Sequence, residues 1–231
     1  MQLLNLPLIP GLVVEQVGTL LTAVKDYAQF KSYVDNLRGG VCPFCDPYFS
    51  QHKDKDGKQL NVAIKTIGDG QDAWRMWNNP FPIRSGKTRI VSAETHLVIA
   101  PVRHITSPNE MTGNDWMAWT SLIQFALTDH DDCGNSGMNL PGGGVLMRFG
   151  DPSLNAGSVL HIHTNIIVPN LKGEARVPLA KEPEDVAENV RILHIFSRIL
   201  SLIEAGDAKT ATEAATMLLP AEQATVQGRL S

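Results

Sequence analysis

The chain has 231 residues, of which 43% are hydrophobic and 19% are charged, a balance typical of soluble globular proteins. Lys and Arg total 20 against 24 Asp and Glu, and the net charge of −4 lacks the basic surplus that non-specific nucleic-acid binding requires. No apolar run reaches the ~18 residues that indicate a membrane span. We therefore expect no nucleic-acid and no membrane partner. A small nucleotide is compatible with this charge, because a few local cations and backbone N–H groups can hold one.

The amino-terminal segment MQLLNLPLIPGLVVEQ is apolar, but it has no positively charged start and contains two prolines. Both features are untypical of a secretory signal. Two of the three cysteines form a C-x-x-C pair, which in a chain without such a signal favours a metal or redox role over a disulfide framework. We therefore expect a cytoplasmic protein.

Hydrophobic periodicity in the first hundred residues predicts one helix followed by several strands. Apolar residues at helical spacing predict a helix over residues 12–37, ended by the pair Gly39-Gly40. The segment VCPFCDPYFS is turn-like, and the charged run QHKDKDGKQ is typical of an exposed loop. Short β-rich runs follow between Leu60 and Pro101: LNVAIKTI, DAWRMW, RIVSA and HLVIAP.

The second half of the chain also contains helical and strand patterns. A helix is predicted over 112–130, and the Gly- and Asn-rich segment CGNSGMNLPGGG leads into a strand, VLMRF. The run SVLHIHTNIIVP is the most strand-like of the chain. Beyond Pro183 the pattern is helical again, and the apolar face over 183–204 indicates core or dimer packing. The simplest organisation is one domain over 1–170, with 171–231 as a helical extension packed on it.

Three polar side chains alternate along the strand-like run: His161, His163 and Asn165. Successive strand residues point to opposite faces, so these three share one face while the largely apolar residues between them share the other. A single histidine would more often have a structural role. Two histidines at this spacing beside an amide indicate a functional site.

The pair Cys42 and Cys45 can share a tetrahedral Zn²⁺ through two thiolates. A second C-x-x-C is absent and Cys133 has no partner, so the remaining ligands would be histidines, of which the chain has seven. A thioredoxin-like redox pair is expected at a strand-to-helix turn, whereas this pair follows a predicted helix and precedes a loop. We favour zinc over a redox role and over plain burial.

Four motifs in order resemble the histidine-triad superfamily. AGSVLHIHTNI is similar to the triad signature, HLVIAPVRH to the upstream strand that usually ends in Pro-Lys-x-His, and CPFC to the zinc knuckle of many members. WNNPFP resembles a nucleotide-contact segment of the branch that contains galactose-1-phosphate uridylyltransferase and dinucleoside-polyphosphate phosphorylases. The motifs span residues 42–169. The resemblance implies an α+β fold with a twisted, mainly antiparallel sheet, packed helices and a helical C-terminal extension, and often a homodimer.

The resemblance also implies the site. It assigns a structural Zn²⁺ to Cys42, Cys45, His104 and His161. The nucleophile would be His163, since a neutral imidazole can attack phosphorus near pH 7. Further roles near a nucleotide or dinucleoside polyphosphate fall to the following residues: Ser158 as a hydrogen-bond donor to the attacked phosphate, Asn165 at the third triad position, and Asn79, Phe81, Arg148 and Gly157 as substrate-binding residues.

The sequence departs from the family at four places. Asn165 stands where hydrolases usually carry His and the transferase branch carries Gln; Val102 replaces the lysine of Pro-Lys-x-His; and Gly157 replaces a common Gln. The loop MRFGDPSLN has no clear match to the usual asparagine, for which Arg148 or Asp151 would substitute. An amide can hold phosphate oxygens but cannot act as an acid for a leaving group. We therefore expect a nucleotidyltransferase or a dinucleoside-polyphosphate phosphorylase. The alternatives are a hydrolase of phosphoramidates or dinucleoside polyphosphates, and a zinc-stabilised nucleotide-binding protein with little turnover.

Overall fold

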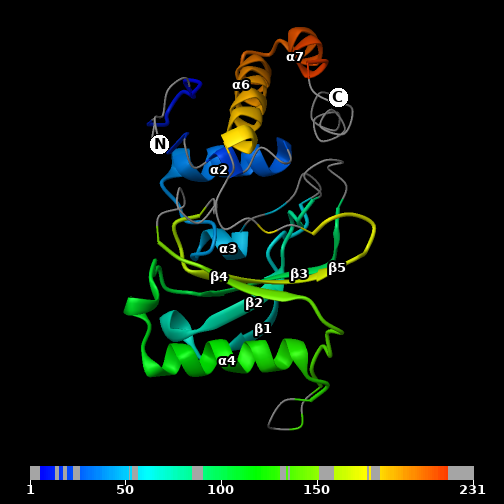
Figure 1. The fold of residues 1–231 in the computed structure, drawn as a ribbon. Coiled ribbons are helices and arrows are strands. Elements are labelled where there is room, and N and C mark those ends of the chain that lie inside the picture. The colour runs from blue at the N-terminus through cyan, green and yellow to red at the C-terminus, as the bar shows by residue number, and fades with distance from the viewer. Residues whose placement is uncertain are drawn as a thin grey trace.

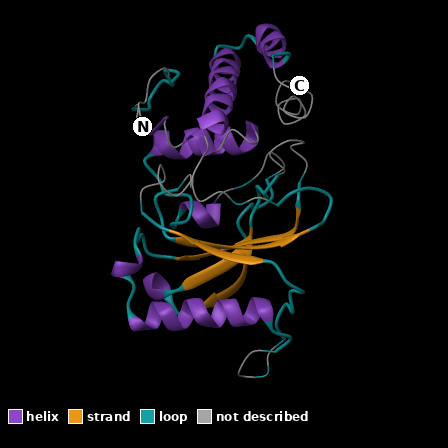
Figure 2. Ribbon diagram, in the orientation of Figure 1, coloured by secondary structure: helices purple, strands orange, loops and turns teal. Residues whose placement is uncertain are grey.

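The computed structural model describes residues 6–13, 16–17, 20–22, 27–51, 53, 57–84, 91–130, 134, 136–150, 159–175, 177 and 183–217. These residues form three layers, with a helical layer on one side of a central sheet and a single long helix on the other (Figures 1 and 2). The predicted α+β fold with an antiparallel sheet, packed helices and a helical C-terminal extension is confirmed. None of the described helices is long and apolar enough to cross a membrane.

The central sheet has five strands in the order β1-β2-β3-β5-β4, and every neighbouring pair is antiparallel. The strands are β1 Ala63–Ile67, β2 Trp74–Asn78, β3 Ala93–Pro101, β4 Gly144–Arg148 and β5 His163–Pro169. The runs that the sequence analysis assigned to β1, β2, β3 and β4 are therefore strands. The run SVLHIHTNIIVP is regular only from His163 onward, so β5 starts five residues later than the pattern predicted.

Helix α4, Gly113–Leu127, covers one face of the sheet, as Figure 1 shows. It begins at a capping box in which the Thr112 hydroxyl accepts a hydrogen bond from the Asp115 N–H and the Asp115 carboxylate accepts one from the Thr112 N–H. Its buried side chains, with Leu122 fully enclosed, pack against Ile162, Ile166 and other apolar residues of the strands. The helix predicted over 112–130 is thus confirmed. This core lies on the face opposite to the polar side chains of β5.

The other layer consists of helices from both ends of the chain. Its elements are η1 Leu20–Thr22, α2 Tyr27–Gly39, α6 Pro183–Glu204 and α7 Ala208–Ala215. Tyr27, Phe30 and Phe196 form an aromatic cluster in its core, with ring centroids 5.2–5.9 Å apart. The apolar face of α6 is therefore core packing against α2. The proposed boundary between residues 170 and 171, which would separate these helices, stays a prediction.

The predicted helix over 12–37 is interrupted in the structure. Regular α-helix begins only at Tyr27 in α2, and the 3-10 turn η1 precedes it. The end of the helix is as predicted, because the Val41 N–H donates to the Asn36 carbonyl and Gly40 has φ +62°. This is a Schellman-type end, in which a glycine in the left-handed region turns the chain out of the helix. A short helix, α3 Tyr48–Gln51, follows the cysteine pair.

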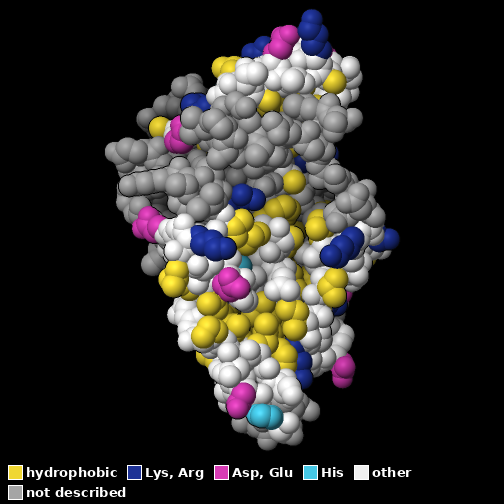
Figure 3. Space-filling model, turned by 90° about the vertical axis from the view of Figure 1, so that its right-hand side faces the viewer, with side chains coloured by type: hydrophobic (Ala, Val, Ile, Leu, Met, Phe, Trp, Pro, Cys, Tyr) yellow, Lys and Arg dark blue, Asp and Glu magenta, His cyan; other side chains and the backbone are white. Residues whose placement is uncertain are grey.

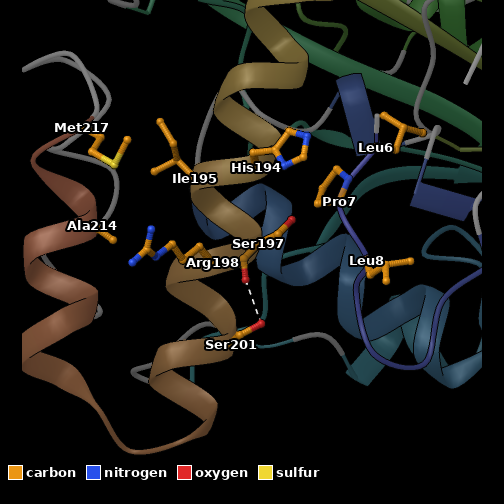
Figure 4. A pocket seen from close by; sticks show the side chains of 10 residues that line it. All are labelled: Leu6, Pro7, Leu8, His194, Ile195, Ser197, Arg198, Ser201, Ala214 and Met217. Carbon is orange, nitrogen blue, oxygen red and sulfur yellow. Dashed lines mark hydrogen bonds between the residues drawn. The ribbon is translucent and has the colours of Figure 1, made fainter. Parts of the chain in front are cut away.

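Two surface features lie away from the polar face of β5. A cavity of about 580 Å³ opens beside α6 between the N-terminal residues 6–8 and α7 (Figure 4).

Hydrophobic side chains also gather at the surface of the half that contains the sheet and α4 (Figure 3). Exposed ones there include Trp116 and Met117 of α4 and Val145 of the edge strand β4. The homodimer that the resemblance implies stays a prediction.

Candidate functional site

The polar face of β5 is on the side of the sheet opposite α4, where Phe44, between Cys42 and Cys45, packs against His161 and His163. His161, His163 and Asn165 are at most 8% exposed, so all three belong to the protein interior. The intervening residues Ile162 and Ile166 lie in the core with α4, and the Thr164 hydroxyl accepts a hydrogen bond from Trp119 Nε1 at 2.8 Å. The alternation predicted from the sequence is therefore present.

The four predicted metal ligands converge on one point. Cys42, Cys45, His104 and His161 each offer a ligand atom, and these atoms lie within 4.8 Å of one another. The distance from Cys42 Sγ to His161 Nδ1 is 3.3 Å, and Cys45 Sγ lies 3.5 Å from His104 Nδ1 and 3.6 Å from His161 Nδ1. Tetrahedral zinc with ordinary Zn–S and Zn–N bonds separates sulfur from nitrogen by about 3.6 Å. The geometry fits a four-coordinate structural zinc.

The surroundings of His161 support the same assignment. Its Nε2 lies 3.1 Å from the carbonyl oxygen of Pro101 and donates to it, so the lone pair is on Nδ1, the nitrogen that faces the two sulfurs. A carbonyl acceptor of this kind is what usually orients a metal-binding imidazole. Hydrogen bonding from the Cys42 thiol, opposed by burial, lowers the pKa of Cys45 to about 4, so this thiol readily supplies a thiolate.

Side chains of the knuckle and of β2 hold the cysteine pair against the sheet. Phe44, between the two cysteines, packs edge-on against Trp77, with ring centroids 5.3 Å apart, and against His163 at 5.2 Å. Arg75 of β2 pairs with Asp46 and lies over the Phe49 ring at 4.8 Å. Trp77 is 1% exposed and belongs to this cluster, which makes it a core residue of the knuckle.

The segment after β3, which carries His104, is anchored by an ion pair with α4. Asp115, which is 1% exposed, accepts hydrogen bonds from Arg103 and from Trp74 Nε1 at 2.9 Å. Burial alone would raise the pKa of Asp115, but hydrogen bonds from Arg103, Trp74 and Thr112 hold it well below its usual value. Because Arg103 precedes His104, this buried ion pair fixes the segment that carries the fourth metal ligand.

His163 has one nitrogen occupied and one available. Its Nδ1 donates to the carbonyl oxygen of its neighbour His161 at 2.8 Å, so the lone pair is on Nε2. Burial, followed by the charge of Arg148, lowers the pKa of His163 to about 4. The imidazole is therefore neutral at pH 7 and keeps the tautomer that a nitrogen nucleophile needs.

Two neighbouring strands add polar groups to this face. Arg148 of β4 is paired with His163 in the sheet register, and residues directly opposite in an antiparallel pair lie on the same face. Burial lowers the pKa of its guanidinium, and an arginine keeps its charge in proteins. A cation thus lies next to the candidate nucleophile, where it can attract a phosphate group.

His96 of β3 also belongs to the site, although its sequence context assigned it no role. Its Nδ1 accepts from the Ile83 N–H at 3.1 Å, so the proton is on Nε2, which donates to Asn165 Oδ1 at 2.9 Å. This bond directs the amide nitrogen of Asn165 away from His96 and leaves it able to donate to a ligand. No local signal marked His96, because a single histidine at the start of an apolar strand is also typical of a structural residue.

Asn79 and Phe81 lie beside His96. The Asn79 Oδ1 accepts from the Phe81 N–H at 2.9 Å, and its Nδ2 lies 3.2 Å from His96 Nε2. Both nitrogens are donors in this arrangement, so Asn79 makes no hydrogen bond to His96. Contact of Asn79 and Phe81 with a substrate stays a prediction. Ser158 and Gly157 lie outside the described residues, although Val159 and Leu160, which follow them, lead directly into His161.

The comparisons with known proteins are sparse. No family model and no curated protein matches the chain. Among solved structures, the chain is similar to a zinc-bound histidine triad family protein from Mycobacterium smegmatis, with 18% identity over 61% of this chain and 87% of that one, and a TM-score of 0.30. At this TM-score the functional interpretation rests on the residues of this chain.

Proposed function

We propose that this protein is a zinc-stabilised nucleotidyl-transfer enzyme in which His163 is the nucleophile. The observation that carries the proposal is the pair of contacts on the His163 ring: Nδ1 is held by a backbone carbonyl, and Nε2 keeps its lone pair in a buried site beside Arg148. A buried neutral imidazole with this tautomer is what attack on a phosphate requires.

The reaction has two balanced steps. Nε2 of His163 attacks the α-phosphorus of a nucleotide or dinucleoside polyphosphate, a P–N bond forms, and the P–O bond to the leaving group breaks. The ring then carries a positive charge, with its Nδ1 proton still shared with the His161 carbonyl. An acceptor oxygen next attacks phosphorus, the P–N bond breaks, and the imidazole becomes neutral again. Four protein ligands leave no open position on zinc, so the metal would only stabilise the fold around the strand.

The acceptor is inferred from the partners of Asn165. Its neighbour His96 accepts a backbone hydrogen bond at Nδ1, so His96 cannot take a second proton without losing that bond. Neither residue is therefore a good acid for a poor leaving group, whereas the Asn165 amide nitrogen can hold a phosphate oxygen. This favours transfer to phosphate or to a sugar phosphate over hydrolysis, with a dinucleoside polyphosphate as the donor.

The test is direct trapping of the intermediate. The zinc-loaded protein is incubated with radiolabelled dinucleoside polyphosphates of each base, quenched in alkali, and analysed for protein-bound label that acid releases. We expect stoichiometric label that maps to His163, and release of a nucleoside diphosphate when inorganic phosphate is added. Absence of label with every donor would favour the binding protein with little turnover. Label followed by release to water at equal rates with and without phosphate would favour the hydrolase.

A further inference from the structure

The turn that carries the two cysteines also carries an aromatic ring that touches both buried histidines. Phe44 lies between Cys42 and Cys45 in the sequence, and the Cys45 N–H donates to the Cys42 carbonyl at 3.2 Å, which closes the turn. The Phe44 ring centroid lies 5.6 Å from that of His161 and 5.2 Å from that of His163, with interplanar angles of 77° and 70°. Aromatic pairs favour this edge-to-face arrangement. One side chain therefore connects the metal cluster with the proposed nucleophile.

The position of Phe44 is fixed from two sides. Its neighbours Cys42 and Cys45 belong to the four-residue metal set, so a bound zinc holds the backbone on both sides of the ring. On the other side, Phe44 packs edge-on against Trp77 of β2, which is 1% exposed, with ring centroids 5.3 Å apart. Trp77 in turn packs against Phe49 of α3 at 4.9 Å. Phe44 is therefore anchored both to the sheet and to the metal site.

The hydrogen bond on the His163 ring is a local one. Its Nδ1 donates to the carbonyl oxygen of His161, two residues away on the same segment, at 2.8 Å. Water that reached the ring would compete for this bond and allow the proton to move to Nε2, which would remove the lone pair from the attacking nitrogen. His163 is 8% exposed, and Phe44 is one of the residues that cover it. A contact on the ring also restrains its plane, and a displacement of about 1 Å can cost about 10²-fold in rate.

We propose that Phe44 is a positioning residue for His163: its ring covers the imidazole, keeps the proton on Nδ1 and directs Nε2 toward the phosphate. This role rests on the proposed nucleophilic attack by His163. Phe44 has no group that can transfer a proton or a phosphate, so it acts only through the histidine. Phe49 offers a matched comparison, because it is the same residue type and packs on the same Trp77, yet among the residues that the structure describes it touches neither histidine.

The first measurement needs no substrate. The zinc-loaded, nitrogen-15-labelled full chain is studied by NMR at pH 7, and the ring nitrogens of His163 are assigned by their loss in His163→Ala. We expect a single tautomer, protonated on Nδ1, in the wild type and in Phe49→Leu, and a mixture of both tautomers in Phe44→Leu. Zinc content and unfolding temperature are measured for each variant. Phe49→Leu should lose at least as much stability as Phe44→Leu, because Phe49 is the more deeply buried ring.

The second measurement follows labelling by a dinucleoside polyphosphate and gives the maximal rate and the half-saturating donor concentration. Phe44→Leu should lower the maximal rate by about 10- to 10²-fold and change the half-saturating concentration by less than about twofold, since positioning acts on the chemical step. Phe44→Tyr keeps the ring and should recover most of the lost rate. Phe49→Leu should be labelled at the wild-type rate.

Mixed tautomers and slow labelling in Phe44→Leu, with wild-type values in Phe49→Leu, support the positioning role. A wild-type tautomer or labelling rate in Phe44→Leu, or equal effects of the two substitutions, would overturn it. A change in the half-saturating concentration alone would also overturn it, because Phe44 would then contact the substrate instead. If Phe44→Leu does not fold, Phe44→Met removes the ring, keeps more of the volume and gives the same readings. If the wild type forms no nucleotidyl-enzyme, the proposed function fails, and the tautomers still decide whether Phe44 positions the imidazole.

Discussion

The polar face that runs from His161 into β5 has a metal end at His161 and a proposed phosphate end at His163, and these two buried histidines differ in which ring nitrogen is free. His161 donates from Nε2 to the Pro101 carbonyl and offers Nδ1 to the cysteines, whereas His163 donates from Nδ1 to the His161 carbonyl and offers Nε2. Both are buried histidines, two residues apart. The carbonyl oxygen beside each ring decides which nitrogen keeps its lone pair: Nδ1 of His161 toward the cysteines, and Nε2 of His163 for the proposed attack on phosphorus.

The largest effect should follow from His163→Ala. Formation of the nucleotidyl-enzyme should fall by at least about 10³-fold, because no neighbouring side chain can replace the nucleophile. One zinc should stay bound, since the metal ligands are untouched, while loss of the buried ring that packs against Phe44 should lower the unfolding temperature moderately. Quenched-flow labelling with a dinucleoside polyphosphate measures the rate. If this variant is labelled at the wild-type rate, His163 is not the nucleophile, and the two histidines do not have the different roles proposed for them.

The reciprocal change, His161→Ala, should act on stability. Loss of one ligand from a site that joins three distant segments should release the metal and lower the free energy of unfolding by on the order of 5 kcal/mol. Metal analysis and denaturant unfolding give the two values. The matched control is His130→Ala, which removes an exposed histidine outside the cluster. A His161→Ala protein that retains one zinc with wild-type stability would show that His161 is no ligand.

Asn165→His tests the residue at the third triad position, two residues after the proposed nucleophile. A third imidazole can donate a proton to a leaving group, so hydrolysis should rise relative to transfer by up to about 10²-fold. The product ratio in the presence of inorganic phosphate measures the change by chromatography. Asn165→Gln is the conservative control and should keep the wild-type ratio. If the ratio in Asn165→His is unchanged, Asn165 does not select the acceptor, while the role of His163 stands.

The pH dependence of labelling should reflect the lowered pKa of the buried His163. Its pKa is lowered to about 4, so the neutral nucleophile persists as pH falls. Labelling should change less than twofold between pH 7.5 and 5.5, whereas an imidazole of ordinary pKa ~6.5 would lose about tenfold. The unfolded chain binds this proton near pH 6.5, so stability present above that pH is lost as pH falls toward 4. A labelling rate that is halved near pH 6.5 would contradict a buried, neutral His163.

The smallest effect concerns the turn that leads into the metal end. Gly40 has φ +62° and its Cβ position is open, so Gly40→Ala is opposed by backbone strain alone. The free energy of unfolding should fall by about 1 kcal/mol, with one zinc still bound. The control is Gly113→Ala at the first residue of α4, where the space is also open and φ is not positive. Equal effects of the two substitutions would show that the left-handed turn is unimportant.

Local patterns predicted much of this molecule. The spacing of apolar residues located α4, α6 and four of the strands, because the period of a helix or a strand is visible in residues that are close in the sequence. The C-x-x-C pair and the two motif histidines predicted the metal set that the structure brings together. The interrupted helix before Tyr27 was missed, since its apolar positions continue through the break at helical spacing.

The sequence by itself determined which residues share one face of the run that leads into β5, because this follows from strand spacing. It also determined that Cys42 and Cys45 can hold zinc, whereas the choice of His104 and His161 as the other ligands came from the resemblance to the histidine-triad superfamily. Only the tertiary structure decided which nitrogen of His161 faces the cysteines and that His96 belongs to the site. Both depend on groups from other segments of the chain, the Pro101 carbonyl and the Ile83 N–H. A hydrogen bond forms only where packing brings donor and acceptor to about 3 Å, and local sequence patterns do not determine that packing.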